Sequence, residues 1–280
     1  MLKRVITSTA IITMTLLVVI FSNYIIYPAT LSLLSVVAVY EILKVMKRQK
    51  KLSLAIPSYV IAAVFPILSY FVTADTGIGY ILILAASVFA YLLYLAGVSI
   101  FSKGHISFIC ISEIFMAVCY VTVSFTSLSL LRYMDADVGI FGVALVFVVA
   151  WVCDVFAYLV GSAIGKHKLI PEISPKKTVE GAIGGIVFTA LACLLYGFIL
   201  EKFFALSVNY LFLAVIGVIL SVVSQLGDLF ASMIKREYGV KDYGNIFPGH
   251  GGVMDRFDSV ISVSTVLLIL CILFPPFTVT

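Results

Sequence analysis

Charged residues are scarce in this sequence. Asp, Glu, Lys and Arg account for 11% of its 280 residues, whereas hydrophobic residues account for 62%. A soluble protein of this length needs more charge to cover its surface, so the composition argues against a soluble enzyme. We expect the lipid bilayer to be the solvent for most side chains, and we expect no nucleic-acid partner.

Cysteine is also sparse, and no two cysteines form a CxxC pair. The five thiols all fall within apolar runs, at Cys110, Cys119, Cys153, Cys193 and Cys271. This placement argues against a disulfide framework and against a zinc site, so we predict buried, unreactive thiols. No internal repeat, low-complexity segment or separate soluble domain is visible.

Long apolar runs are what the sequence does contain. About 20 helical residues cross a hydrocarbon core of roughly 30 Å. Nine runs approach or exceed that length, at residues 5–21, 25–45, 54–72, 78–101, 106–131, 138–164, 182–200, 208–227 and 259–274. Barrel strands would alternate in polarity and be about half as long, so we predict helices. The first run follows Lys3 and Arg4, as a signal peptide would, but no small-residue cleavage site follows it, and we interpret it as a retained helix.

Basic residues predict the orientation of these helices. With a cytoplasmic N-terminus, 16 of the 18 Lys and Arg residues fall in cytoplasmic segments, and only Arg132 and Lys202 fall outside. Cytoplasmic loops are enriched in Lys and Arg, so this split favours nine spans in that orientation. The predicted fold is an all-α integral membrane protein, a polytopic bundle of about nine transmembrane helices in the cell (inner) membrane.

Polar residues divide the chain into two regions. Residues 1–137 form about five helices with little polar chemistry. The basic run at 47–51 is interpreted there as a topology anchor or a contact for anionic lipid. Glu41 could be functional, but Lys44 at i+3 could be its partner, so the simpler interpretation is an interfacial glutamate. Residues 138–280 contain two long cytoplasmic loops, 165–181 and 228–258, in which acidic, basic and glycine residues occur together. We therefore expect the chemistry at the cytoplasmic face of residues 138–280.

The segment 172–181, EISPKKTVEG, predicts an anion site. Ser174 could cap a helix with Pro175 at its first position, which would place Lys176, Lys177 and Thr178 in the first turn. Cations at a helix N-terminus oppose the helix dipole, so the arrangement favours a phosphate held by backbone N–H groups, a hydroxyl and two ammonium groups. The alternative is an ordinary capped helix whose lysines set the topology.

Two carboxylates are predicted to lie on membrane helices. Asp228, Ser232 and Lys235 recur at helical spacing, so they share one face at the end of the eighth run. A carboxylate there is costly unless it binds a cation or forms an ion pair, for which Lys235 is available. Asp154 lies about 15 Å inside the sixth run at 1.5 Å per residue, so it must face a polar cavity, a cation or hydrogen-bond donors.

The segment 244–259 reads GNIFPGHGGVMDRFDS and combines glycines, an imidazole, a guanidinium and two carboxylates, at Gly249, His250, Gly251, Gly252, Asp255, Arg256 and Asp258. Glycines let the backbone approach a ligand closely, and carboxylate oxygens suit Mg²⁺. Together with Asp228, these residues predict a site for a nucleoside triphosphate with Mg²⁺. His250 could bind metal, act as an acid or base, or form only a hydrogen bond, and helix capping alone would explain one Asp.

These motifs form one longer pattern. Over some 27 residues it runs Ser232-Met-Ile-Lys235-Arg236, Lys241-Asp242, Gly244, Phe247-Pro248, His250-Gly251-Gly252-Val253 and Asp255-Arg256-Phe257-Asp258. Upstream are Asp154-x-x-Ala157-Tyr158-x-x-Gly161, Gly165-Lys166 and Ser174-Pro175-Lys176-Lys177-Thr178-x-Glu180-Gly181. The pattern resembles the phosphatidate cytidylyltransferase (CDP-diacylglycerol synthase) family, with Ser162 as a departure where relatives often carry a basic residue. The resemblance covers about residues 151–259 and rests only on hydropathy and topology before them.

The resemblance implies a membrane enzyme that converts CTP and phosphatidic acid to CDP-diacylglycerol and pyrophosphate, with Mg²⁺ as cofactor and the site facing the cytoplasm. A homodimer is suggested by the family alone. We expect Asp228 and Asp255 to bind metal, with Asp258 and Asp154 as further candidates. The expected catalytic residues are Asp228, Asp255, Lys235, Arg256 and His250. The expected nucleotide- and phosphate-binding residues are Ser174, Lys176, Lys177, Thr178, Arg236, Lys241, Gly251 and Gly252.

Three other functions are alternatives to this one. A CTP-dependent lipid kinase of the dolichol or phytol type would transfer the γ-phosphoryl group and leave CDP. An ion-coupled transporter would account for Asp154 inside a span, but transporters tend to show internal repeats, and here the polar residues gather at one face. A CDP-alcohol phosphotransferase is disfavoured because its D-x-x-D-G-x-x-A-R pattern is absent.

Overall fold

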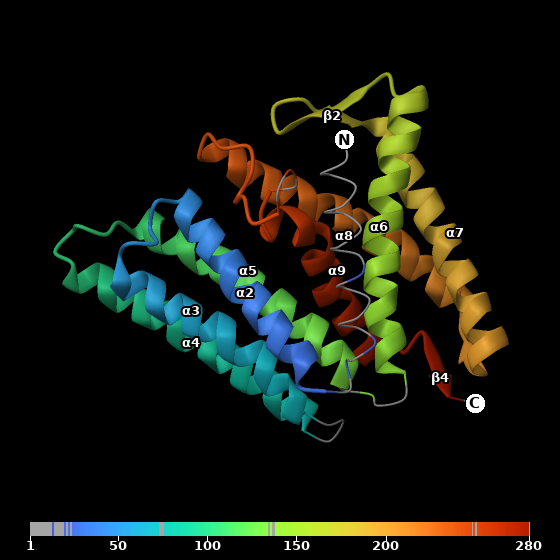
Figure 1. Ribbon diagram of the computed structural model, residues 1–280, viewed down its shortest axis with the longest axis horizontal. Helices are drawn as coiled ribbons and strands as arrows, with labels where there is room; N and C mark the ends of the chain where they lie inside the picture. Colours follow the sequence, from blue (N-terminus) through green and yellow to red (C-terminus); the bar gives the residue numbers. More distant parts are fainter. Residues whose placement is uncertain are drawn as a thin grey trace. The chain divides into compact units, whose positions relative to one another are not determined.

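The computed structural model describes residues 13, 20, 22, 24–72, 76–133, 135, 138–247, 249 and 251–279 (Figure 1). Within these residues, eight helical segments are long and apolar enough to cross a membrane. They are α2 (Ile26–Val45), α3 (Leu52–Leu68) with the short 3₁₀ helix η1 (Ser69–Phe71), α4 (Gly77–Phe101), α5 (Phe108–Tyr133), α6 (Gly139–Ile164), α7 (Val179–Phe204), α8 (Tyr210–Glu237) and α9 (Met254–Leu273). They correspond to the second to ninth predicted runs and confirm an all-helical, multi-pass membrane protein. The first predicted run, 5–21, lies outside the described residues.

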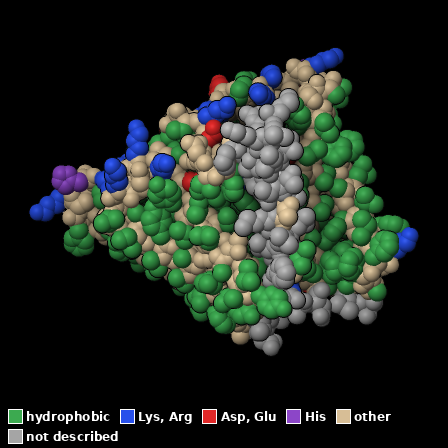
Figure 2. Space-filling model, viewed as in Figure 1, with side chains coloured by type: hydrophobic (Ala, Val, Ile, Leu, Met, Phe, Trp, Pro, Cys, Tyr) green, Lys and Arg blue, Asp and Glu red, His purple; other side chains and the backbone are tan. Residues whose placement is uncertain are grey.

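The surface of these helices is strongly apolar. Phe101, Phe108 and Leu211 are each more than three-quarters exposed. Figure 2 shows hydrophobic side chains over most of the described surface in view, with Lys and Arg side chains at its margins. Such a surface would be unfavourable in water, whereas hydrocarbon solvates it.

The chain divides into two compact units, and each is described by itself. Unit 1 contains Met1–Asp135 and Val240–Arg256. In it, α2, α3 and α5 pack against one another, and α4 packs on α3 and α5. Polar side chains join these helices: the Tyr27 hydroxyl donates to the Leu128 carbonyl over 3.0 Å, and the Ser58 and Tyr91 hydroxyls lie 2.7 Å apart. Such bonds satisfy polar groups that the bilayer cannot hydrate.

Unit 2 contains Ala136–Gly239 and Phe257–Thr280, so α9 begins in unit 1 and continues in unit 2. Glycines let α6 and α7 pack closely, because a Cβ atom at Gly184 would lie 2.6 Å from the Val160 Cβ. Helix α8 packs on both α6 and α7. At one end, strand β3 (Leu206–Val208) pairs antiparallel with β4 (Phe277–Val279).

A second strand pair corrects one prediction. Residues predicted to begin a helix at Ser174 instead form strand β2 (Ser174–Thr178), which pairs antiparallel with β1 (Lys168–Ile170). Helix α7 begins after Thr178, whose hydroxyl accepts a hydrogen bond from the Gly181 N–H over 3.2 Å. This later start places Glu180 in the first turn, where a negative charge is favourable, and leaves Lys176 and Lys177 outside the helix.

Two boundaries of the predicted loop 228–258 also differ. Helix α8 continues to Glu237, and α9 already begins at Met254. An apolar run ends where the sequence becomes polar, whereas a helix can continue into water beyond that point. Asp228 and Lys235 lie on α8, as their helical spacing predicted, and Asp255 lies in the first turn of α9.

Candidate functional site

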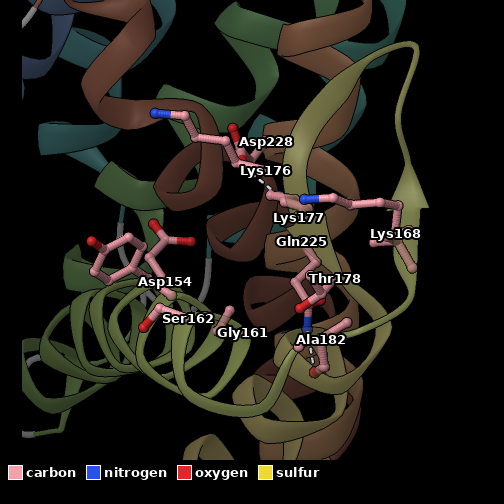
Figure 3. A pocket seen from close by; sticks show the side chains of 14 residues that line it. Asp154, Gly161, Ser162, Lys168, Lys176, Lys177, Thr178, Ala182, Gln225 and Asp228 are labelled. Atoms are coloured by element: carbon pink, nitrogen blue, oxygen red, sulfur yellow. Dashed lines mark hydrogen bonds and ion pairs between the residues drawn. The ribbon is translucent and has the colours of Figure 1, made fainter.

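A pocket of about 460 Å³ lies within unit 2 (Figure 3). Its walls come from α6, the β1–β2 hairpin, the first turn of α7 and the polar end of α8. The lining consists of Asp154, Ala157, Tyr158, Gly161, Ser162, Gly165, Lys168, Leu169, Lys176, Lys177, Thr178, Ala182, Gln225 and Asp228. The pocket therefore gathers three lysines and two carboxylates in a chain that has few charges.

Glycines allow the hairpin and α7 to approach α6. A Cβ atom at Gly161 would lie 2.8 Å from the Thr178 hydroxyl oxygen, and one at Gly165 would lie 2.6 Å from the same oxygen. On α7, a Cβ atom at Gly181 would lie 2.5 Å from the Ala157 carbonyl oxygen. These contacts leave no room for a larger side chain, so the three glycines hold β2, and with it Lys176 and Lys177, against the end of α6.

The two predicted motifs of unit 2 meet in an ion pair. Lys177 Nζ of β2 contacts Asp228 Oδ2 of α8, and the two side chains are 24% and 27% exposed. Figure 3 shows this contact at the pocket wall. Local helical spacing favoured Lys235 as the partner of Asp228, whereas Lys177 lies 51 positions earlier in the chain. An ion pair at this exposure is weak and exchangeable.

Three carboxylates of unit 2 influence one another. Asp258 interacts electrostatically with Asp228 and Asp154, and also with Lys235. The Asp258 Oδ1 atom accepts a hydrogen bond from the Ser259 N–H over 2.8 Å, and the Ser259 hydroxyl donates to Asp154 Oδ2 over 3.4 Å. Helices α8 and α9 come close here because Gly227 has no side chain: a Cβ atom there would lie 2.9 Å from the Asp258 carbonyl oxygen.

The chemistry of these donors suits a hard cation. Among the described residues, no three or more His, Cys, Asp and Glu side chains are already arranged to hold a metal ion. The donors of unit 2 are nevertheless carboxylates without thiols or imidazoles, which is the ligand type of Mg²⁺. The repulsion of Asp258 by Asp228 and by Asp154 would also be relieved by a cation. The residues therefore fit Mg²⁺ by their chemistry.

The glycine-rich motif of unit 1 wraps around a buried carboxylate. Asp255, in the first turn of α9, is 8% exposed. Its Oδ2 atom accepts hydrogen bonds from the Tyr243 N–H over 2.7 Å and the Gly252 N–H over 2.9 Å. The turn requires Gly251, whose φ of +86° strains other residues and whose Cβ atom would lie 2.7 Å from Asp255 Oδ2.

Glu41 of α2 also contacts this glycine-rich motif. The sequence did not predict this contact. Glu41 is 1% exposed, and its carboxylate accepts hydrogen bonds from the N–H groups of Val253 and Met254 over 3.1 and 2.9 Å. The expected partner, Lys44, acts on Glu41 only through its charge. The direct hydrogen-bond donors to Glu41 are thus backbone N–H groups of a distant segment, which local spacing did not predict.

The remaining predicted residues lie at several places. In unit 2, Ser174 pairs with Ile170 across the hairpin, Lys235 is buried, and Arg236 Nε donates to the Ile173 carbonyl over 3.3 Å. In unit 1, Lys241 and Arg256 are exposed. His250 lies outside the described residues.

Lys168 and Gln225 line the pocket but were not predicted as site residues. Lys168 is one of the 16 basic residues assigned to cytoplasmic segments by their number alone. Gln225 precedes Asp228 by three positions, so helical spacing could have placed both on one face. The Gln225 amide nitrogen donates to the Ala182 carbonyl over 3.2 Å, and this bond holds the amide at the pocket wall.

Known proteins resemble this chain over most of its length. The sequence profile of the family described as "Cytidylyltransferase family" matches residues 2–274. A protein of Bacillus subtilis (strain 168) is 41% identical over 191 residues, which is 67% of this chain and 68% of the relative. A protein of Staphylococcus haemolyticus (strain JCSC1435) is 39% identical over 186 residues, 66% of this chain and 68% of the relative.

A protein of Staphylococcus epidermidis (strain ATCC 12228 / FDA PCI 1200) is 40% identical over 174 residues, or 62% of this chain. The alignment spans 64% of that relative, which is less than two thirds of its length. All three relatives carry the name phosphatidate cytidylyltransferase.

Proposed function

Since this chain belongs to the cytidylyltransferase family, we propose that it transfers the cytidylyl group of CTP to phosphatidic acid, giving CDP-diacylglycerol and pyrophosphate for phospholipid biosynthesis. The observation that carries the proposal is the pocket of unit 2, whose lining includes Lys168, Lys176 and Lys177 together with Asp154 and Asp228. Lysines suit phosphate oxygens, and carboxylates suit the cation that accompanies a nucleoside triphosphate.

The proposed reaction is a displacement at the α-phosphorus of CTP. A phosphate oxygen of phosphatidic acid attacks this atom, a new P–O bond forms, and the bond to the α,β-bridging oxygen breaks. Pyrophosphate leaves with the electron pair of that bond. A phosphate monoester is largely dianionic at neutral pH, so it needs no strong general base. The protein must mainly align two polyanions and stabilise the leaving group.

The ion pair between Lys177 and Asp228 supports an exchange of partners when substrate binds. Lys177 would turn to a phosphate oxygen of CTP, and the Asp228 carboxylate would become available as a ligand. Both side chains are about one-quarter exposed, so neither must leave a tightly packed interior. The residues proposed to bind phosphate or nucleotide are Ser174, Lys176, Lys177, Thr178, Arg236, Lys241, Gly251 and Gly252, and Lys168 joins them as a pocket residue.

Mg²⁺ is the proposed cofactor. Asp228 and Asp255 would hold it, with Asp258, one helical turn after Asp255 on α9, and Asp154 as further ligands. When bound, Mg²⁺ would neutralise triphosphate charge and polarise the α-phosphorus. Lys235 and Arg256 would stabilise negative charge that develops on the leaving group, and His250 would donate a hydrogen bond or a proton to it.

Location and assembly are part of the same proposal. The distribution of Lys and Arg supports nine spans, a cytoplasmic N-terminus and a site on the cytoplasmic side of the cell (inner) membrane, where CTP is available. Residues 138–280 would form the catalytic region and residues 1–137 the N-terminal helices. A homodimer is proposed from the family alone.

The test uses detergent-purified protein, phosphatidic acid and each labelled nucleoside triphosphate, with and without Mg²⁺. We expect a CDP-lipid from CTP only, dependent on Mg²⁺, with one pyrophosphate per lipid. CDP and a phospholipid without cytidine would identify a lipid kinase instead. Absence of any CDP-lipid, from protein that remains monodisperse in detergent, would remove the proposal.

A further inference from the structure

Glu41 connects α2 to a segment more than 200 residues later in the chain. Its Oε1 atom accepts the Val253 N–H over 3.1 Å, and its Oε2 atom accepts the Met254 N–H over 2.9 Å. Both donors and Glu41 belong to unit 1, and Figure 1 shows the segment before α9 beside α2. At 1% exposure, Glu41 is the most deeply buried carboxylate among those described in unit 1.

The two residues before α9 lack a side chain that could accept backbone N–H groups. The first N–H groups of a helix have no partner within the helix. A Ser, Thr, Asp or Asn side chain at the N-cap usually accepts one of them. Here the two preceding residues are Gly252 and Val253, which offer no side-chain acceptor. Glu41, from another helix, accepts the N–H groups of Val253, the residue before α9, and of Met254, its first residue.

Asp255 accepts two further backbone N–H groups. Its Oδ2 atom holds the Gly252 and Tyr243 N–H groups. Four backbone donors are thus divided between two carboxylates, two to each. The two carboxylates also repel each other, so this division keeps each one on its own pair of donors.

The fit around Glu41 is tight. A Cβ atom at Gly244 would collide with Glu41 Oε1, and a Cβ atom at Gly252 would collide with the whole carboxylate. Two glycines of the motif therefore leave the space that Glu41 occupies. Even a methyl group at Gly244 or Gly252 would collide with Glu41, so the position of this carboxylate depends on both glycines.

We propose that Glu41 is a positioning residue that directs the Asp255 carboxylate. Without it, the N–H groups of Val253 and Met254 would be buried and unsatisfied, which is costly. The neighbouring Asp255 carboxylate would then be drawn toward them and away from Tyr243. The consequence for catalysis rests on the proposed function, in which Asp255 binds the metal, but the consequence for the Tyr243 amide does not.

Hydrogen exchange of the full-length protein in detergent, followed by mass spectrometry, tests this directly. Glu41→Gln keeps the shape of the side chain but replaces one acceptor by a donor, and Glu41→Ala removes both acceptors. We expect exchange at the Tyr243 amide to become about tenfold faster in both variants, although Tyr243 does not bond to Glu41. The control Glu113→Gln, on α5 of the same unit, should match the unmodified protein. Faster exchange confined to Val253 and Met254 would overturn the proposal and reduce Glu41 to a helix cap.

Turnover gives a second readout. Measured per folded molecule, Glu41→Gln should raise the Mg²⁺ concentration for half-maximal rate about tenfold and change the KM for CTP much less. An unchanged Mg²⁺ dependence together with a protected Tyr243 amide would contradict the positioning role. If the unmodified protein makes no CDP-lipid, the proposed function fails, and the Tyr243 amide alone decides the role of Glu41.

Discussion

In unit 1, Glu41 and Asp255 are 1% and 8% exposed, and together they accept four hydrogen bonds from backbone N–H groups. In unit 2, Asp228 is 27% exposed and contacts the ammonium group of Lys177. A backbone N–H group cannot turn away without deforming the loop, whereas a lysine side chain rotates freely and exchanges partners. We therefore call Glu41, Asp255 and their backbone donors the framework of unit 1, because these hydrogen bonds are fixed. The ion pair of Asp228 and Lys177 in unit 2 can open when a ligand binds.

Removing only the charge of Asp255 should have the largest effect on turnover while leaving the hydrogen bonds of the loop intact. Because Oδ2 alone accepts both backbone bonds, the amide oxygen of Asp255→Asn can take its place and keep the loop. We expect kcat/KM to fall about 10³-fold, since several kcal/mol of metal-dependent stabilisation would be lost. Exchange at the Tyr243 amide should stay slow. Near-normal turnover would mean that Asp255 serves the loop alone.

Two variants make this result interpretable. Glu237→Gln removes an exposed negative charge at the end of α8 and should leave turnover unchanged. Asp255→Ala removes the charge and the acceptor together, so it should combine the loss of turnover with fast exchange at Tyr243. Agreement between Asp255→Ala and Asp255→Asn in both readouts would contradict the separation of charge from loop structure.

The ion pair of unit 2 should matter for ligand exchange and little for stability. Lys177→Ala is expected to lower kcat/KM about 10²-fold through the loss of a charge-assisted phosphate contact. The melting temperature should change by at most a few degrees, because a partly exposed pair contributes on the order of 1 kcal/mol. Turnover and thermal unfolding are measured on the same preparation.

Exchanging the charges at positions 177 and 228 tests whether the ion pair itself or the identity of each side chain is required for turnover. Lys177→Asp combined with Asp228→Lys restores an ion pair between the same positions but exchanges the two charges. We expect it to remain inactive, because neither position then suits its ligand. Recovered turnover would show that the pair itself is the functional element. Lys202→Ala, at the other end of α7, serves as the control for loss of a lysine in unit 2.

Hydropathy predicted the helices well because every span needs a run of about 20 apolar residues to cross the hydrocarbon core. It placed their ends less well, since a helix such as α8 continues to Glu237 after its sequence becomes polar. The segment at Ser174 was mistaken for a helix start because Ser-Pro is a common capping pair. The structure puts the cap at Thr178, where the following Glu180 agrees with the helix dipole and two lysines no longer oppose it.

The candidate site was predictable only in part. Lys176, Lys177, Asp154 and Asp228 were conspicuous as charges in an apolar chain, and all four line the pocket. Glu41 was conspicuous in the same way, but its partners could not be predicted, because backbone N–H groups of Val253 and Met254 have no signature in sequence. A remote contact with main chain is decided by how the helices pack, and local spacing carries no information about it.

Gly252→Ala tests how tightly the framework of unit 1 is built. The added methyl group would collide with the Glu41 carboxylate, so we expect a loss of about 1–3 kcal/mol in the free energy of unfolding. Gly97→Ala is the control, because a Cβ atom at Gly97 of α4 meets open space. In a Glu41→Ala background, Gly252→Ala should cost clearly less, since the obstacle is gone. Equal costs in both backgrounds would argue against the contact. Thermal unfolding in detergent measures all four variants.

The smallest expected effect on stability comes from a helix cap supplied by the residue next to the helix, and not by another helix as at Glu41. Asn209 caps α8 in unit 2, where its Oδ1 atom accepts the Phe212 N–H over 3.0 Å. Asn209→Ala should cost about 1 kcal/mol of stability, and Asn209→Asp should retain most of it. Neither should alter turnover per folded molecule, because this cap holds no carboxylate of the proposed site. If Asn209→Ala did lower turnover, loss of any cap would suffice to impair the enzyme, and reduced turnover in Glu41 variants could no longer be attributed to Asp255.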